Sequence, residues 1–199
     1  MKEKKVIGLT GKYCAGKNHV ASILEKLGFP VLDLDKLGHQ VIENEKERLL
    51  ESFGTDILGA GSEIDRKKLG EKVFGNNEKL SVLEGIIHPA VNRETMSWIA
   101  GTKKTCFINA ALLHRSSAFK TLDAVIIVEA PFLVRLLRAK KRDKLPLPVL
   151  IRRFRSQRNF HSQYFNGKTD IYRVSNKSAR KKTHLESRIN KILSLLGIL

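Results

Sequence analysis

The sequence VIGLTGKYCAGKNHV, at residues 6–20, carries the strongest structural signal in this 199-residue chain. Residues 6–9 form a short apolar run that predicts a buried strand. Gly11 and Gly16 bound a turn that is rich in glycine and lysine, and apolar residues at helical spacing follow over residues 19–27. This stretch therefore predicts a strand, a tight turn and a helix in direct succession.

The pattern that follows indicates a parallel sheet. Gly28 is suited to end the first helix, and residues 29–32 read as a second strand. A strand, a helix and a second strand in this order form a βαβ unit, whose two strands are parallel. Further strands are expected at residues 105–108, 124–128 and 170–174, the last of them at a sheet edge. We therefore expect one α/β domain.

Helices are expected in three other parts of the chain. Residues 36–100 read as helical, and the helix over 76–98 should be kinked or divided at Pro89, which lacks the N–H that an interior position donates. Residues 135–158 are basic, and prolines divide them into two helical pieces. The last helix carries an apolar stripe made of Leu185, Ile189, Ile192 and Leu196.

Charge is distributed unevenly along the chain. The net charge of +17 comes entirely from residues 101–199, since Lys and Arg balance Asp and Glu over residues 1–100. Such an excess favours anionic partners: nucleic acid, an acidic membrane or a polyphosphate ligand. No apolar run reaches the roughly 18 residues of a membrane helix, and the basic start leads into no signal-peptide pattern, so we expect a cytoplasmic protein. The two cysteines predict reduced thiols, of which Cys14 is a candidate for reactivity.

The glycine-rich turn matches the phosphate-binding pattern G-x-x-x-x-G-K-[ST] at Gly11, Gly16 and Lys17. A polyphosphate requires a row of backbone N–H groups at a helix N-terminus, and Lys17 would reach its outer phosphates. A generic glycine turn is the alternative. Asn18 replaces the hydroxyl residue that normally binds Mg²⁺, so its amide oxygen is the candidate metal ligand. The expected ATP-binding residues of the loop are Gly11, Lys12, Tyr13, Cys14, Ala15, Gly16, Lys17, Asn18 and His19.

Several further stretches, in their order along the chain, make the sequence resemble the dephospho-coenzyme A kinase family. These stretches are residues 7–11, 31–35, 53–54 with 64–66, 69–74, 87–89 with Arg93, Arg142 with Asp143, Gln157, and 170–176. Two stretches depart from the family's pattern. The loop GGIGSGKS is changed at residues 12, 13, 14 and 18, and the motif PLLFE is replaced by ALLHR at residues 111–115.

The resemblance implies a three-layer P-loop fold with five parallel strands in the order 2-3-1-4-5. It implies a single kinase domain, with a core at residues 1–54, 101–137 and 166–199, a helical acceptor-binding subdomain at 55–100 and a lid at 138–165. The implied reaction uses ATP and Mg²⁺ to phosphorylate the ribose 3′-hydroxyl of dephospho-CoA, the last step of coenzyme A biosynthesis. We expect a monomer with no membrane partner and no nucleic acid partner.

Asp35 is the expected proton acceptor, because ligands bind where the strands of an open α/β sheet end. Residue chemistry alone does not separate Asp35 from Asp33, and strand alternation would point both the same way; the family resemblance favours Asp35. The other interpretation of this aspartate is that it caps the helix that follows. Lys17 and the lid residue Arg142 complete the expected catalytic set.

Other candidate residues follow from the resemblance and from charge. Arg138, Arg142 and Asn176 would bind ATP; Arg66, His88 and Arg93 would bind the acceptor. For Arg138 and Arg142 the alternative is a solvated basic helix face. For His88 it is a structural role, and for Arg66 and Arg93 it is a surface ion pair.

Two other functions are consistent with the sequence. The same fold could phosphorylate a nucleoside or nucleotide, but the acceptor region at 36–100 resembles that of the dephospho-CoA enzymes. The +17 charge and the altered loop would also suit a catalytically impaired nucleotide-binding or nucleic-acid-binding protein. The basic segment lacks the interleaved aromatic residues on which bases would stack.

Overall fold

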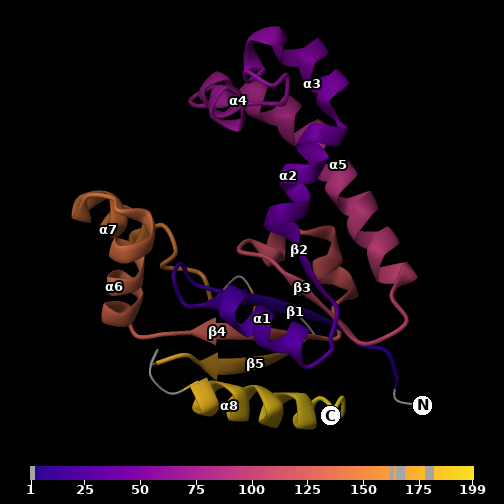
Figure 1. Cartoon of the computed structure of the whole chain (residues 1–199), viewed down its shortest axis with the longest axis vertical. Helices are drawn as coiled ribbons and strands as arrows, with labels where there is room; N and C mark the ends of the chain where they lie inside the picture. Colours follow the sequence, from indigo (N-terminus) through magenta and orange to yellow (C-terminus); the bar gives the residue numbers. More distant parts are fainter. Residues whose placement is uncertain (1–2, 162–163, 165–168, 178–181) are drawn as a thin grey trace. The chain divides into compact units, whose positions relative to one another are not determined.

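A computed structural model describes residues 3–161, 164, 169–177 and 182–199 of the chain (Figure 1). Its centre is a five-stranded sheet with the strand order β2-β3-β1-β4-β5, as predicted. The strands are β1 (Val6–Gly11), β2 (Val31–Asp33), β3 (Cys106–Asn109), β4 (Ala124–Glu129) and β5 (Asp170–Ser175). β1 is parallel to both β3 and β4, and β4 is parallel to β5, which lies at the sheet edge as expected.

Helices α1 (Lys17–Lys26) and α8 (Lys182–Leu195) cover one face of this sheet. Their apolar side chains pack with alternate residues of β1 and β4, including Ile7 and Ile126, in one continuous core. The other face packs against short 3-10 segments, η2 (Leu113–Arg115) and η3 (Ser117–Thr121). Gly8 is needed there, because a Cβ at this position would lie 2.5 Å from the Leu113 side chain.

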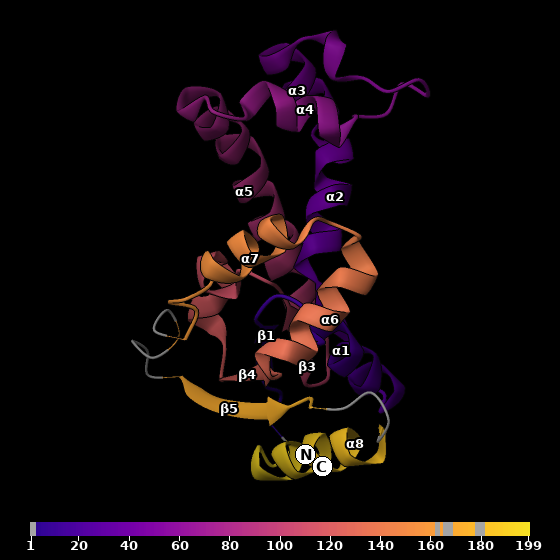
Figure 2. The ribbon, with the colours of Figure 1, turned by 90° about the vertical axis from the view of Figure 1, so that its left-hand side faces the viewer.

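Two helices lie on the side of the sheet at which the strands end (Figures 1 and 2). They are α6 (Phe132–Asp143), which Pro131 precedes, and α7 (Leu147–Arg155), which has a proline in its first turn. Lys144, with φ of 53°, adopts the left-handed conformation that ends α6. The predicted lid, residues 138–165, includes most of α6 and all of α7; its residues 162, 163 and 165 lie outside the described part.

Tyr164 fixes the far end of this segment to the sheet. Its side chain is buried, and its hydroxyl lies 3.3 Å from both Thr10 Oγ1 and His114 Nδ1. The rings of Phe160, Phe119 and His114 surround it at centroid distances of 5.2–5.8 Å. The lid segment is therefore anchored beside β1, the strand that leads into the glycine-rich loop.

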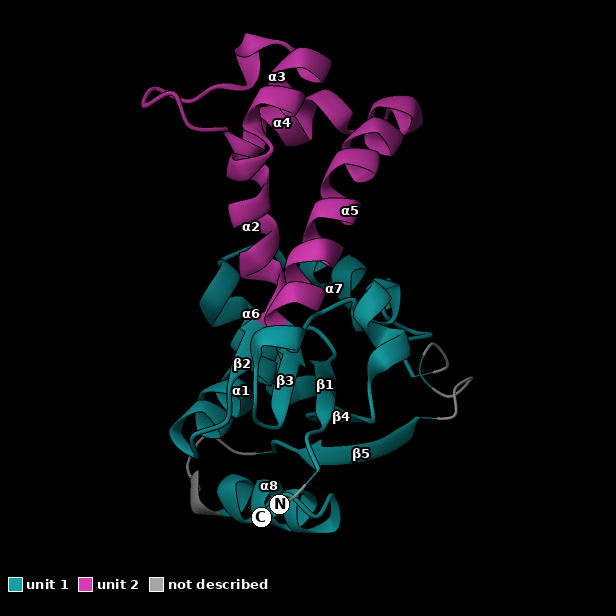
Figure 3. Ribbon diagram, turned by 90° about the vertical axis from the view of Figure 1, so that its right-hand side faces the viewer, with its two compact units in different colours: residues 1–32, 99–199 teal, residues 33–98 magenta. Residues whose placement is uncertain are grey.

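The chain divides into two compact units, residues 1–32 with 99–199 and residues 33–98 (Figure 3). The second unit holds α2 (Leu34–Asn44), α3 (Lys46–Phe53), η1 (Thr55–Ile57), α4 (Arg66–Val73) and most of α5 (Asn77–Gly101). It has its own apolar core, made of Leu49, Phe53, Ile57, Ile64, Leu69, Val73 and Ile86. No helix of the described residues is long and apolar enough to cross a membrane.

Of the two outcomes expected at Pro89, a kink or a division of the long helix, the division does not occur, because α5 continues through Pro89. Proline removes one hydrogen bond and crowds the carbonyl four residues earlier, which here belongs to Gly85. Pro89 and Gly85 are both exposed, so water can solvate the released carbonyl. On the opposite side, Ile86 and Ala90 are buried and hold the helix in place.

Candidate active site

The loop between β1 and α1 has the backbone geometry that a phosphate-binding turn requires. β1 is buried along its whole length and ends at Gly11, where a Cβ would lie 2.6 Å from the Val128 carbonyl oxygen. Gly16 has φ of 97° and ψ of 29°, a left-handed conformation that favours glycine. Both glycines of the motif are therefore required by the backbone.

The N-terminus of α1 is open to an anionic ligand. Gly16 is the N-cap and supplies no side-chain acceptor, and the first turn holds no acidic residue. The early N–H groups of a helix carry partial positive charge and bind phosphate oxygens. Lys17 is the first residue of α1, so its ammonium group stands at the same end of the helix.

Cys14 occupies a strained position in this loop. Its φ is 57°, a left-handed value that costs a non-glycine residue about 1–2 kcal/mol. Burial raises the pKa of its thiol, and this effect outweighs the opposing influence of the lid arginines, led by Arg142. The sequence suggests a reactive thiol, and a raised pKa does not favour that reactivity, because the thiolate is the reactive form.

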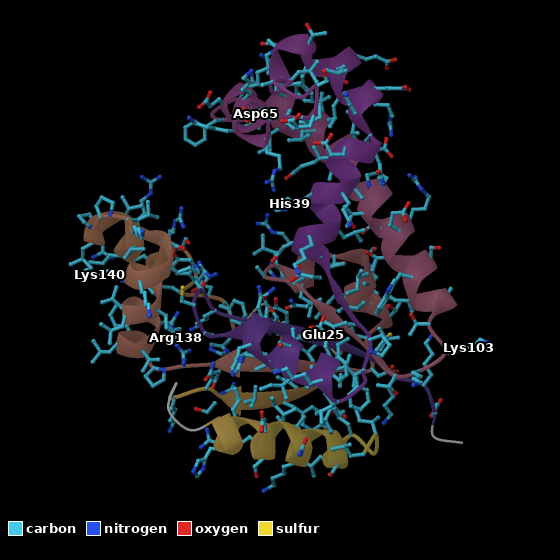
Figure 4. All side chains as sticks on the ribbon, in the orientation of Figure 1. Glu25, His39, Asp65, Lys103, Arg138 and Lys140 are labelled. Carbon is cyan, nitrogen blue, oxygen red and sulfur yellow. The ribbon has the colours of Figure 1, made fainter. Side chains whose placement is uncertain are left out.

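Arg138, which Figure 4 labels, and Asn176 both contact the loop. Arg138 Nη1 donates to the Ala15 carbonyl at 3.1 Å, and its Nη2 donates to Asn176 Oδ1 at 3.3 Å. Asn176, which is buried, donates from Nδ2 to the same Ala15 carbonyl at 3.0 Å. Two residues from distant parts of the sequence thus meet at the phosphate loop.

Tyr13 joins the loop to the lid. Its hydroxyl donates to Asp143, and its backbone N–H donates to Gln157 Oε1 at 2.7 Å. The guanidinium of Arg142 lies 5.1 Å from the centre of the Tyr13 ring, and Arg142 Nε also donates to Asp143 at 2.7 Å. Arg153 lies 3.5 Å from the same carboxylate. The side chain of Tyr13 therefore faces the lid arginines.

A cavity of about 260 Å³ lies beside the loop, at the carboxyl ends of β4 and β5. Burial lowers the pKa of the Lys12 ammonium at its edge, and neighbouring Arg135 lowers this pKa further. Glu129, the acid in the lining, lies 3.5 Å from His161 Nε2 and 3.9 Å from Arg173 Nε. Cations thus surround the loop on this side as well.

The donor groups at the end of the loop do not fit a magnesium ion held by the protein. Asn18 Oδ1 accepts a hydrogen bond of 3.3 Å from Nδ2 of Asn109, which is buried at the end of β3. Both groups are neutral amides, whereas protein-bound Mg²⁺ is usually held through carboxylates. Among the described residues, no group of three His, Cys, Asp or Glu side chains could hold a metal ion.

The structure separates the roles of Asp33 and Asp35. Asp33 is the N-cap of α2, and its carboxylate accepts from the N–H groups of Asp35 and Lys36 at 3.0 and 3.2 Å. β2 ends at Asp33, so strand alternation does not extend to Asp35, and the expectation that it orients both residues is wrong. Asp35 is exposed in the first turn of α2.

The three candidate acceptor residues belong to the unit 33–98, as does Asp35. Arg66, at the start of α4, lines a cavity of about 540 Å³ together with His39, Glu43, Glu63, Ile64, Asp65 and Lys67. Arg93 donates to Glu45 at 3.2 Å, the surface ion pair that was its alternative interpretation. His88 is exposed on α5. Neither His88 nor Arg93 lines that cavity.

Sequence reasoning missed Asn109 and the side-chain contacts of Tyr13. Asn109 stands at the carboxyl end of a central parallel strand, where ligands bind in open α/β folds, and this rule could have identified it. Tyr13 and Asp143 are 130 positions apart, so no local sequence pattern predicts their contact.

Comparison with known proteins identifies the family of this chain. The family model described as dephospho-CoA kinase (CoaE) matches residues 5–172. A dephospho-CoA kinase of Treponema denticola is 34% identical over 202 residues, which cover 95% of this chain and 91% of that relative. The enzyme of Bacillus cereus is 31% identical, with 94% of this chain and 96% of the relative covered.

Solved structures share the fold of this chain. TT1252 from Thermus thermophilus superimposes with a TM-score of 0.80 and 29% identity, over 100% of this chain and 99% of that one. A dephospho-CoA kinase from Campylobacter jejuni gives a TM-score of 0.67 and 26% identity, with 97% of each chain covered. A shikimate kinase from Acinetobacter baumannii, at 17% identity and a TM-score of 0.55, shares the fold alone. The chain belongs to the dephospho-CoA kinase family.

Proposed function

We propose that this chain transfers the γ-phosphoryl group of ATP to the ribose 3′-hydroxyl of dephospho-CoA, the last step of coenzyme A biosynthesis. The observation that carries the proposal is the convergence of Arg138 and Asn176 on the Ala15 carbonyl of the phosphate loop. This arrangement puts a guanidinium and a buried amide beside the N-terminus of α1. The choice of dephospho-CoA as the acceptor rests on the family to which the chain belongs.

The loop and lid would act by positioning and by neutralising charge. Backbone N–H groups of the loop and the ammonium group of Lys17 bind the outer phosphates of ATP. Arg142, which α6 presents next to Tyr13, neutralises the charge that develops on the transferred group. Arg138, which contacts the Ala15 carbonyl, would fold over the phosphates together with Arg142, and Asn176 would approach the adenine of ATP.

Asp35 would accept the proton from the 3′-hydroxyl, or orient that hydroxyl for attack. Asp33 is less suited to this role, because its carboxylate already caps α2. In an in-line transfer, the hydroxyl oxygen forms a bond to the γ-phosphorus as the bond to the β-γ bridging oxygen breaks. The hydroxyl proton passes to Asp35, and ADP leaves.

The acceptor would bind to the unit 33–98, with Arg66, His88 and Arg93 as candidate contacts. Arg66 is the best supported of these, since it lines a cavity large enough for part of a nucleotide. The divalent cation enters as the substrate complex of ATP. We further propose that the protein is cytoplasmic and monomeric, with no nucleic acid or membrane partner.

A direct assay tests this function. The purified chain is incubated with ATP, Mg²⁺ and dephospho-CoA, and the product is identified by mass spectrometry and phosphorus NMR as the 3′-phosphate. Adenosine and nucleoside monophosphates serve as competing acceptors, and 3′-deoxy-dephospho-CoA is the matched control without the reacting hydroxyl. If a nucleoside monophosphate is the better acceptor, the proposed substrate is wrong. Salt-sensitive gel shifts without any phosphoryl transfer would favour nucleic-acid binding instead.

A further inference from the structure

Asn18 and Asn109 form an amide pair at the position where phosphate loops usually meet a metal ion. Asn18 follows Lys17 directly and occupies the eighth position of the loop motif. Asn109 ends β3, the strand next to β1, where it is in register with Leu9. The Nδ2 group of Asn109 donates to Asn18 Oδ1 at 3.3 Å.

The chemistry of this pair differs from that of other P-loop enzymes. These usually hold Mg²⁺ with a Ser or Thr hydroxyl at the eighth position and with an Asp from a neighbouring strand. Here both groups are uncharged, so the attraction between a carboxylate and a divalent cation is missing. In addition, the oxygen of Asn18 already accepts a hydrogen bond from an N–H donor.

Positive side chains of the loop and lid surround the same ligand space. Lys12 and Lys17 stand in or directly after the loop, and Arg138 binds the Ala15 carbonyl. Arg135 Nη1 reaches the Tyr13 carbonyl at 3.5 Å, and Arg142 lies over the Tyr13 ring. These groups can balance the phosphate charge that a metal ion would otherwise share.

The carboxylates on this side of the loop are already paired with cations. Asp143 binds Arg142 at 2.7 Å and lies 3.5 Å from Arg153. Glu129 Oε1 lies 3.9 Å from Arg173 Nε. It also lies 3.5 Å from His161, whose pKa is lowered by burial. Two carboxylates beside the loop, Asp143 and Glu129, thus lie within ion-pair distance of arginines.

We propose that Asn18 and Asn109 form a neutral amide pair in place of a magnesium site, so that the protein adds no affinity of its own for the divalent cation. The cation then arrives and leaves with ATP, and the loop and lid cations hold the phosphates. This inference rests on the ATP binding in the proposed function and does not depend on the acceptor.

Manganese, which is paramagnetic, provides a direct measurement. Electron paramagnetic resonance gives the dissociation constant of Mn²⁺ from ATP alone and from ATP bound to the protein. We expect the two constants to agree within about twofold, because amides add little attraction. If bound ATP holds Mn²⁺ tenfold more tightly than free ATP does, the proposal is wrong. Calorimetry in EDTA should still detect ATP binding, and its complete loss would also overturn the proposal.

Introducing a carboxylate at this pair should give the protein its own affinity for the divalent cation. In Asn109→Asp, the charged oxygen faces the site, and we expect Mn²⁺ to bind the ATP complex at least about tenfold more tightly than in the parent. Because Asn109 is buried, Asn18→Asp at the exposed position serves as a second variant that tolerates the charge. Asn190→Asp, on the exposed side of α8, adds the same charge elsewhere and should change nothing.

These variants also separate the inference from the proposed function. Mn²⁺ and ATP binding need no acceptor, so the metal measurements stand even if dephospho-CoA is not phosphorylated. Thermal denaturation confirms that each variant is folded. If both Asp variants are folded and bind ATP, and neither tightens Mn²⁺ binding, the amide pair is not at a metal position and the inference fails.

Discussion

The hydroxyl of Tyr13, in the phosphate loop, donates a hydrogen bond to the carboxylate of Asp143, the last residue of lid helix α6. The same carboxylate binds Arg142, and Arg153 donates to the Tyr13 hydroxyl at 3.4 Å. The Tyr13 ring packs against Phe154 of α7 at a centroid distance of 5.3 Å. The side chain of Tyr13 therefore contacts both α6 and α7 and lies against one arginine from each.

Removing this hydroxyl should weaken ATP binding. In Tyr13→Phe the ring contacts remain, but the hydrogen bond to a charged group is lost, and we expect the ATP dissociation constant to rise about three- to tenfold. Tyr13→Ile removes the ring as well and should have a larger effect. Calorimetry measures the affinity, and amide hydrogen exchange in α6 and α7 should become faster in both variants.

The matched control is Tyr172→Phe, which removes the same atom from β5, where the ring packs against the core below the sheet. It should bind ATP like the parent. Equal ATP affinity and equal exchange in Tyr13→Phe would show that the contact does not organise the lid.

Cys14→Gly should stabilise the protein. Glycine adopts the observed φ of 57° without the steric cost that cysteine bears, although its flexible unfolded state reduces the gain. We expect the free energy of unfolding to rise by up to about 1 kcal/mol, or roughly 2–4 °C in Tm. Cys14→Ala removes the thiol and keeps the Cβ, so it should give no such increase. A similar increase in Cys14→Ala would assign the effect to the sulfur and not to the backbone.

Asp33 and Asp35 should respond differently to the removal of charge. Asp33→Ala removes the N-cap of α2 and should cost about 1 kcal/mol of stability, measured by urea denaturation. Asp35→Asn leaves that cap in place and should reduce kcat by about 10²-fold or more, with stability unchanged. A purified Asp35→Asn variant with full turnover would exclude the proton-acceptor role.

Arg138→Lys should lose ATP affinity although the charge is kept. The guanidinium reaches the Ala15 carbonyl and Asn176 with two different nitrogens, which an ammonium group cannot do from one position. We expect the dissociation constant for ATP to rise about tenfold. Lys140→Ala, on an exposed position of the same helix, removes a full charge and should have little effect (Figure 4). If both variants lost ATP affinity equally, the hydrogen bonds of Arg138 would have no specific role in binding ATP.

The sequence was sufficient to predict the sheet and the loop. Residues 6–9, 106–108 and 124–128 are short apolar runs, Pro30 precedes β2, and the backbone itself requires Gly11 and Gly16. These are local signals, so they can be read from neighbouring residues. The strand order was inferred by analogy with related kinases and is confirmed.

The contacts that complete the site could not be read in the same way. Asn109 meets Asn18 across 91 positions, and Asn176 meets Ala15 across 161 positions. Such pairs depend on tertiary packing, which leaves no periodic pattern in the sequence. The helix is not divided at Pro89 for a related reason, since the exposure of Gly85 and the burial of Ile86 favour a continuous helix.

The buried hydroxyl of Tyr164 restrains the segment that we propose as the lid. It attaches the end of the lid segment to Thr10, directly before the phosphate loop, while the start of α6 is continuous with β4. A segment tied at both ends explores a small volume, so its arginines stay at a high effective concentration over the loop. Binding ATP then costs little additional chain entropy, because folding has already restricted the conformations of this segment.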